Sequence, residues 1–203
     1  ILDYDSASLA ASLSSYWPVK SADVRDYVSG CDLTANRILL QERDRFDNLD
    51  SAVSVSGYYL SAPQSVYFTG GGDLTVSAWV KVYNCSAWSG LFEFGNGAGQ
   101  DNVLLEFSPA CLPRFVIYTG STQTGQSVSS ITALRENVWT HVAATLAASS
   151  SSLKIYVNGV IVGNGLLSVG PPADVSRSNN WFGRTEFCLL YTSPSPRDRG
   201  NHL

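Results

Sequence analysis

A strict alternation of apolar and polar side chains constrains the fold of this chain more than any other feature. In residues 73–82, DLTVSAWVKV, one face is wholly apolar: Leu74, Val76, Ala78, Val80 and Val82. Successive side chains of a β-strand point to opposite faces, so the segment predicts a strand with one buried face. Residues 137–147 and 51–60 alternate in the same way and predict two more long strands. We expect Trp79 and Trp139, which stand in mid-strand, to belong to the core.

The sharpest local signal is the dipeptide Asn158-Gly159, which separates two β-branched runs in LKIYVNGVIVG. This dipeptide is typical of a two-residue type I′ hairpin turn, in which both central residues take positive φ. The turn predicts two cross-strand pairs, Val157 with Val160 and Ile155 with Val162.

Further short strands are expected between turns rich in Gly, Ser and Asn, and no segment has a helical repeat longer than about two turns. These strands are expected at residues 15–19, 91–95, 102–107, 114–118 and 180–183. Many strands without alternating helices predict an all-β fold, an antiparallel sandwich of two packed sheets. The length of 203 residues fits one such domain.

Charge and hydropathy exclude two classes of partner. The chain has 13 Lys and Arg against 17 Asp and Glu, a formal net charge of -4, and its basic residues are scattered. It therefore lacks the basic field that a nucleic-acid partner requires. No apolar run approaches the roughly 20 residues that span a bilayer, so no membrane insertion is expected. The chain contains no Met, which we interpret as a fragment or a processed chain.

Two cysteines are placed symmetrically about a predicted hairpin. The segments LFEFG and NVLLEF flank the glycine-rich turn NGAGQD, and Cys85 and Cys111 lie at equal distances on either side of it. Opposed residues of an antiparallel hairpin have a constant index sum, which predicts a Cys85–Cys111 disulfide; two unrelated buried thiols are the alternative. Cys31 is left without a partner, and Asn84 begins an Asn-Cys-Ser sequon for N-glycosylation.

Two sets of carboxylates could supply acid–base chemistry. Glu93 and Glu106 stand on the two strands of this hairpin, where they could approach each other on one face and serve as a catalytic acid pair. Glu42, Asp44 and Asp47, in ERDRFD, approximate a carboxylate spacing found in sandwich-fold glucanases. Their arginine neighbours favour a solvated charged loop instead.

Metal and nucleophilic sites have little support. His141 is the only histidine before the C-terminal tail and lies in mid-strand, so we interpret it as a packed sheet histidine, and zinc lacks a ligand set. Calcium is the candidate metal that the composition could serve, with Asp101, Asn102 and either Asn96 or Gln100 as oxygen donors. The same residue types would also form a plain turn, and this alternative stays open. No other cofactor is expected.

The ordered motifs carry a family resemblance. YFTGGGDLTVSAWVKV, WSGLFEFGNGAGQDNVLLEF, LRENVWTHVAATL, LKIYVNGVIVGNG and NNWFGRTEF resemble, in order and spacing, a laminin-G-like, concanavalin A-like jelly-roll domain. The resemblance spans about residues 13–187, with residues 1–12 as an N-terminal extension. It implies that ligands bind at the rim loops or across the concave sheet, with calcium present in some members and lost in others. Trp88 and Trp181, near strand and loop ends, are the candidates for stacking on sugars.

The resemblance implies a function that the fold does not fix by itself. We expect a non-catalytic module that binds carbohydrate or a glycoprotein, as part of a larger secreted or cell-surface protein. A glycoside hydrolase of the same fold, using Glu93 and Glu106 or the ERDRFD run, is the first alternative. A purely structural adhesion spacer is the second.

The C-terminal tail stands apart from these motifs. CLLYTSPSPRD, within residues 188–203, resembles the in-frame translation of a transposon-based sequencing-library adapter, although a natural Pro-Ser linker is the compositional alternative. We interpret residues 188–203 as an artefact that replaces the last strand of the jelly roll. An apolar, uncovered sheet edge is the expected consequence.

Overall fold

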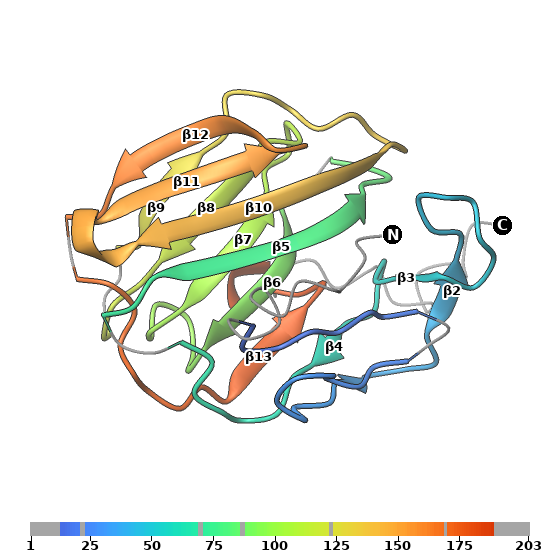
Figure 1. Ribbon diagram of the computed structural model, residues 1–203, viewed down its shortest axis with the longest axis horizontal. Helices are drawn as coiled ribbons and strands as arrows, with labels where there is room; N and C mark the ends of the chain where they lie inside the picture. Colours follow the sequence, from blue (N-terminus) through green and yellow to red (C-terminus); the bar gives the residue numbers. More distant parts are fainter. Residues whose placement is uncertain are drawn as a thin grey trace, which may run out of the picture.

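The protein is described by a computed structural model over residues 13–20, 23–68, 71–85, 88–121, 124–168 and 170–188 (Figure 1). Two antiparallel sheets pack face to face, which confirms the predicted all-β sandwich. The larger sheet has seven strands in the order β1 (Thr34–Ala35), β4 (Leu60–Ser61), β13 (Asn179–Phe182), β6 (Ser89–Gly95), β7 (Val103–Phe107), β8 (Pro113–Ile117) and β9 (Gln126–Ser129).

The smaller sheet has four strands, in the order β12 (Val160–Leu166), β11 (Ser152–Val157), β10 (Trp139–Ala147) and β5 (Leu74–Lys81). A separate two-stranded ribbon is formed by β2 (Leu40–Glu42) and β3 (Ala52–Ser54), at the right of Figure 1. The helical elements of the described residues are two short 3₁₀ turns, η1 (Ala148–Ser150) and η2 (Glu186–Cys188). No helix in this part of the chain has the length and apolarity to cross a membrane.

The core lies between the two sheets and is built by the alternation seen in the sequence. The inner face of β10 contributes Val142, Ala144 and Leu146, each 1% exposed or less. From the opposite sheet come Phe92, Phe94 and the inner residues of β7 and β8. Burying these side chains contributes about 1.5–3 kcal/mol for each large residue.

The expected place of two tryptophans in the core is wrong. Trp79 pairs with His141 on the outer face of the smaller sheet, where 41% of its surface is exposed, and Trp139 pairs with Lys81 beside it. The physical reason is the alternation itself, because Val80 and Ala78 occupy the inward positions on either side of Trp79. Among the described residues, no third layer covers this face.

The Asn158-Gly159 hairpin is confirmed, and its register departs from expectation beyond the first pair. Asn158 and Gly159 have φ of 49° and 80°, as a type I′ turn requires, and Val157 pairs with Val160. A β-bulge between Ile155 and Tyr156 then shifts the strands. The outcome of that shift is that Ile155 pairs with Gly163, not with Val162.

Two of the predicted strands, residues 51–60 and 15–19, are not formed as continuous strands. Residues 51–60 form the short β3 and β4, because Gly57 takes φ of 74° in a turn that breaks the run. Residues 15–19 are irregular, since Pro18 has no backbone donor and Val19 takes φ of 48°. The other short strands were predicted to within two residues, whereas β1, β2 and β9 were missed.

The predicted loss of the last strand stays a prediction. Residues 189–203 lie outside the described part of the chain, as do residues 1–12. Within the described residues, β5 pairs with β10 alone and forms one edge of the smaller sheet. Three inward side chains of β5, Leu74, Val76 and Ala78, are only partly buried.

Candidate functional site

The predicted acid pair and the predicted stacking residues lie on the outer face of the seven-stranded sheet, the face that points away from the core. Cross-strand pairing places Glu93 between Trp181 on β13 and Leu104 on β7. Along the next row, Glu106 pairs with Gly90 on one side and with Arg114 on the other. The sheet therefore brings both glutamates and one of the two tryptophans onto one surface.

Glu93 is fully buried on this face, and both of its carboxyl oxygens accept hydrogen bonds. Asn102 donates from Nδ2 to Oε1 at 2.6 Å, and the backbone N–H of Glu186 donates to Oε2 at 2.7 Å. Burial raises the pKa of Glu93 to about 7, and the nearby charges of Glu186 and Glu106 act in the same direction. The side chain is thus a buried acid that titrates near neutral pH.

The segment that contains η2 accounts for this burial, because it crosses the outer face above β6 and β8. Thr185 is fully buried, and a Cβ added to Gly90 would lie 2.2 Å from its methyl carbon. Two residues further on, the ring of Phe187 stacks on Tyr118, with centroids 5.3 Å apart and planes inclined by 17°. Only glycine at position 90 allows so close an approach.

Glu106 and Arg114 form an ion pair beside an exposed tryptophan. Nη1 of Arg114 lies 3.1 Å from Oε1 of Glu106, and burial raises the pKa of Glu106 against the opposing effect of Arg114. The guanidinium carbon lies 5.5 Å from the centre of the Trp88 ring, and Nη2 donates to Oγ of Ser127 at 3.4 Å. Trp88 itself is 39% exposed. This cluster presents the Trp88 ring and part of the Arg114 side chain to solvent, while Glu106 is buried beneath them.

Trp181, the other predicted stacking residue, is half-buried in an aromatic and cationic stack. The guanidinium carbon of Arg184 lies 4.4 Å from the Trp181 ring and 4.9 Å from the Tyr59 ring. Those two rings meet edge to face at 6.5 Å. Nε of Arg184 is buried and has no hydrogen-bond partner among the described residues.

The two candidate acid sets are placed differently from expectation. Glu93 and Glu106 are not directly opposed, because the hairpin register pairs Glu93 with Leu104, while Glu106 pairs with Gly90 beyond a bulge. Both side chains are at most 5% exposed. In ERDRFD, the Asp44 carboxylate accepts three hydrogen bonds within its own turn, two from the backbone N–H groups of Phe46 and Asn48 and one from Nδ2 of Asn48.

The predicted calcium donors lie together at one end of the sandwich, and each already accepts protein hydrogen bonds. Oδ1 of Asn96 accepts from the N–H of Ser178 at 3.0 Å, and Oδ1 of Asn102 accepts from the N–H of Gln100 at 2.6 Å. Oδ1 of Asp101 accepts from the N–H of Gly120 at 2.7 Å. These contacts organise the rim loops without a metal, and the calcium site stays a prediction.

A fully buried arginine completes the same rim. Arg177 donates to the carbonyl oxygens of Asp101, Val175 and Ala173, at 2.8–3.2 Å, and its guanidinium carbon lies 5.0 Å from the Phe68 ring. Burial lowers the pKa of Arg177, while Asp101 and Asp174 oppose that change. A guanidinium thus holds carbonyl groups that a cation could otherwise bind. The sequence carried no signal for this role.

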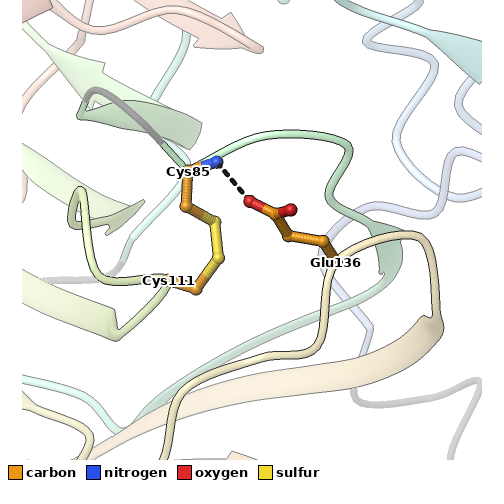
Figure 2. Close-up of side chains that lie close together, drawn as sticks. All are labelled: Cys85, Cys111 and Glu136. Atoms are coloured by element: carbon orange, nitrogen blue, oxygen red, sulfur yellow. Dashed lines mark hydrogen bonds between the residues drawn. A yellow bond between two sulfur atoms is a disulfide. The ribbon is translucent and has the colours of Figure 1, made fainter.

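The predicted disulfide is confirmed. Cys85 and Cys111 are bonded with Cα atoms 5.2 Å apart, and Figure 2 shows the carboxylate of Glu136 beside them, accepting from the N–H of Cys85 at 3.1 Å. The three side chains lie close enough for a metal, but the sulfurs are bonded to each other. Cys31 is a free thiol, and Asn84 is exposed.

An open pocket that the sequence did not predict lies in the N-terminal segment. It has a volume of about 430 Å³ and is lined by Tyr16, Pro18, Lys20, Asp23 and Tyr27. Asp23 is tied to Arg25 and Tyr27 by hydrogen bonds, so its carboxylate is already engaged. None of the predicted site residues lines this pocket.

The two packed antiparallel sheets and their polar, aromatic outer face define a jelly-roll sandwich of the lectin type. A family model, the concanavalin A-like lectin/glucanases superfamily, matches residues 54–192, and the chain belongs to that superfamily. No curated protein matches the chain significantly.

Solved structures with similar folds include carbohydrate-binding domains. Domain 4 of AbnA, an extracellular GH43 arabinanase from Geobacillus stearothermophilus, in complex with arabinotriose, has 15% identity and a TM-score of 0.65, over 84% of this chain and 82% of that chain. The CBM40 domain of the Ruminococcus gnavus IT-sialidase, bound to α2,3-sialyllactose, has 18% identity and a TM-score of 0.47. That match covers 57% of this chain and 64%, under two thirds, of the other. The arabinanase domain shows that the fold is shared.

Proposed function

We propose that this domain is a non-catalytic carbohydrate-binding module that holds its glycan on the outer face of the seven-stranded sheet, at Trp88. The observation that carries the proposal is the exposed Trp88 ring beside the Glu106–Arg114 pair. Membership of a lectin and glucanase superfamily supports it, as does the fold shared with an arabinanase domain that was solved with arabinotriose.

The chemistry of this cluster suits a neutral sugar. The apolar C–H face of a sugar ring packs on an indole, while hydroxyl groups need both donors and acceptors nearby. Arg114 supplies donors, and the exposed hydroxyl of Ser127 supplies both a donor and an acceptor. Because the arginine and the glutamate neutralise each other, the cluster has no net charge that would favour an ionic ligand.

Trp181 provides a second aromatic contact on the same face. Its partners Tyr59 and Arg184 form a compact stack with it. An oligosaccharide that lies along the face could contact Trp88 with one sugar unit and this stack with another. Trp88 is the primary contact, since it is the more exposed ring.

The burial of the acid pair supports a binding role over a hydrolase. A general acid must reach the glycosidic oxygen, within hydrogen-bond distance. Glu93 has a pKa near 7, suitable for an acid, but segment 184–188 covers it and both oxygens are bonded. Glu106 is buried and forms an ion pair with Arg114. The disulfide between Cys85 and Cys111 supports an extracellular or cell-surface location, where such bonds persist.

Glycan-array screening of the wild-type domain, with and without calcium, tests the proposal. We expect binding to neutral glycans, and loss of that binding in Trp88→Ala. Leu166→Ala, which removes an apolar side chain 74% exposed on β12, is the control. An absence of binding to every glycan in both conditions would favour the structural spacer, and release of reducing sugar would favour the hydrolase.

A further inference from the structure

The outer face of the four-stranded sheet is free of acidic residues. Strands β5, β10, β11 and β12 contain no Asp or Glu, while their outward positions include Lys81, Lys154 and His141. The whole chain carries more acidic than basic residues, 17 against 13. This face therefore differs in charge from the rest of the protein.

Arg45 extends this face from the loop between β2 and β3. Its guanidinium carbon lies 4.3 Å from the centre of the Phe46 ring and 4.6 Å from that of Trp79. Among the described residues it has no ion pair and no hydrogen bond. A guanidinium has five N–H donors in a planar fork that matches carboxylate and sulfate groups. Here the aromatic rings hold its plane, and the donors remain available.

The acidic neighbours of Arg45 are engaged elsewhere. Asp44 accepts hydrogen bonds from the backbone N–H groups of Phe46 and Asn48. The Asp47 carboxylate lies 3.3 Å from Nη1 of Arg43. The two carboxylates thus bond to their own turn and to a different arginine, and neither forms a direct pair with Arg45.

Lys81 provides a second cation on the same face. Its Nζ lies 5.6 Å from the Trp139 ring and 5.2 Å from the Tyr83 ring, and no described carboxylate pairs with it. Lys81 and Trp79 are two positions apart on β5, so about 6–7 Å separates them along the strand. His141 pairs with Trp79, their rings 5.4 Å apart.

We propose that this surface, formed by Arg45, Trp79, Lys81, Trp139 and His141, binds an acidic polysaccharide that carries sulfate or carboxylate groups. The two cations pair with anionic groups, while the tryptophan edges contact the sugar rings between them. A nucleic acid is disfavoured, because binding its closely spaced phosphates requires many cations. This surface offers two strong cations, Arg45 and Lys81, and the protein as a whole is acidic. The inference is independent of the neutral-glycan site at Trp88.

Dextran sulfate and uncharged dextran, which share one backbone, provide the test, with polygalacturonate as the carboxylate probe. We expect the wild type to bind the sulfated polymer, the carboxylated polymer or both in 50 mM salt, and dextran at least tenfold more weakly. Raising the salt tenfold should weaken binding, as expected for exposed charges. Equal binding of dextran and dextran sulfate, with no binding of polygalacturonate, would overturn the proposal.

Matched variants locate the site. Arg45→Ala should weaken binding on the order of tenfold, the value of a charge-assisted contact, and Arg45→Lys should restore part of it. Arg43→Ala removes the same charge from the same loop but does not touch Trp79, and should change affinity less than about twofold. Equal losses in Arg45→Ala and Arg43→Ala would overturn the site. A DNA duplex bound as tightly as dextran sulfate, through Arg45, would overturn the choice of ligand.

Discussion

Nδ2 of Asn102 donates to Oε1 of Glu93 at 2.6 Å, and this bond joins a rim loop to the buried centre of the outer sheet face. Asn102 also accepts from the N–H of Gln100, so one side chain serves both regions. The predicted acid pair and the predicted calcium donors are therefore parts of a single hydrogen-bonded network. The first three tests below concern this network and the segment 184–188 that covers it. The fourth concerns the disulfide.

The raised pKa of Glu93 makes stability depend on pH. The folded state binds this proton more tightly than the unfolded state, with a pKa of about 7 against 4.5. Stability is therefore lost as pH rises from about 5 to 8, by up to about 3 kcal/mol for this group. Urea unfolding of the wild type and of Glu93→Gln, at about pH 5 and about pH 8, measures this loss of stability.

The variant comparison isolates Glu93 from other titrating groups. Glu106 acts in the same direction, and His141, whose pKa is lowered by burial, acts in the opposite direction, but both are present in each protein. We expect a shallower loss of stability in Glu93→Gln. Equal pH slopes in the two proteins would show that Glu93 ionises freely.

Gly90→Ala should lift the covering segment. The new Cβ would lie 2.2 Å from Cγ2 of Thr185 and 2.9 Å from the carbonyl oxygen of Arg184. Overpacking of this kind costs about 1–3 kcal/mol. Hydrogen exchange at the Glu186 amide should accelerate. Gly170→Ala, where nothing lies within 4 Å, is the control; similar effects in both variants would contradict the close packing.

Calcium should have little effect on stability at the rim of Asn96, Asp101 and Asn102. Their oxygens already accept protein hydrogen bonds, and the charge of Arg177 lies beside them. We expect the same Tm in millimolar calcium and in chelator, since only a ligand of the native state stabilises it. A rise of several degrees that disappears in Asp101→Asn would establish the calcium site instead.

The disulfide should contribute about 3 kcal/mol, because it closes a loop with a sequence separation of 26. Cys85→Ser together with Cys111→Ser should lower the free energy of unfolding by that amount, while Cys31→Ser, at the free thiol, should change it little. Mass spectrometry after alkylation provides the direct check. Free labelling of Cys85 and Cys111 without reductant would contradict the bond.

The sandwich was predictable because alternation records which side of each strand is buried. That signal located β5 and β10, and symmetric placement located the disulfide. The signal failed where single backbone conformations decide the path, as at Gly57 in its positive-φ turn. Glu93 and Glu106 are offset for a similar reason, since the geometry of the turn sets the register that pairs Glu93 with Leu104, and this geometry leaves no clear signal in the alternation.

The environment of the candidate site was not predictable from local sequence. Glu186 covers Glu93 from a position 93 residues further along the chain, so the sequence near Glu93 does not predict its burial. The exposure of Trp79 depends likewise on the absence of a third layer over its sheet in the described residues. The stacking of Arg45 on Trp79 joins two segments that composition alone identified only as a charged loop and a strand.

Contact of the glycan with the Trp88 ring is checked by isothermal titration of the neutral oligosaccharide identified on the array, into the wild type, Trp88→Ala and Leu166→Ala. We expect binding to be weaker by about fivefold or more in Trp88→Ala, since a stacked aromatic contributes on the order of 1 kcal/mol. Binding should be unchanged in Leu166→Ala. Wild-type affinity in Trp88→Ala would show that the glycan binds elsewhere.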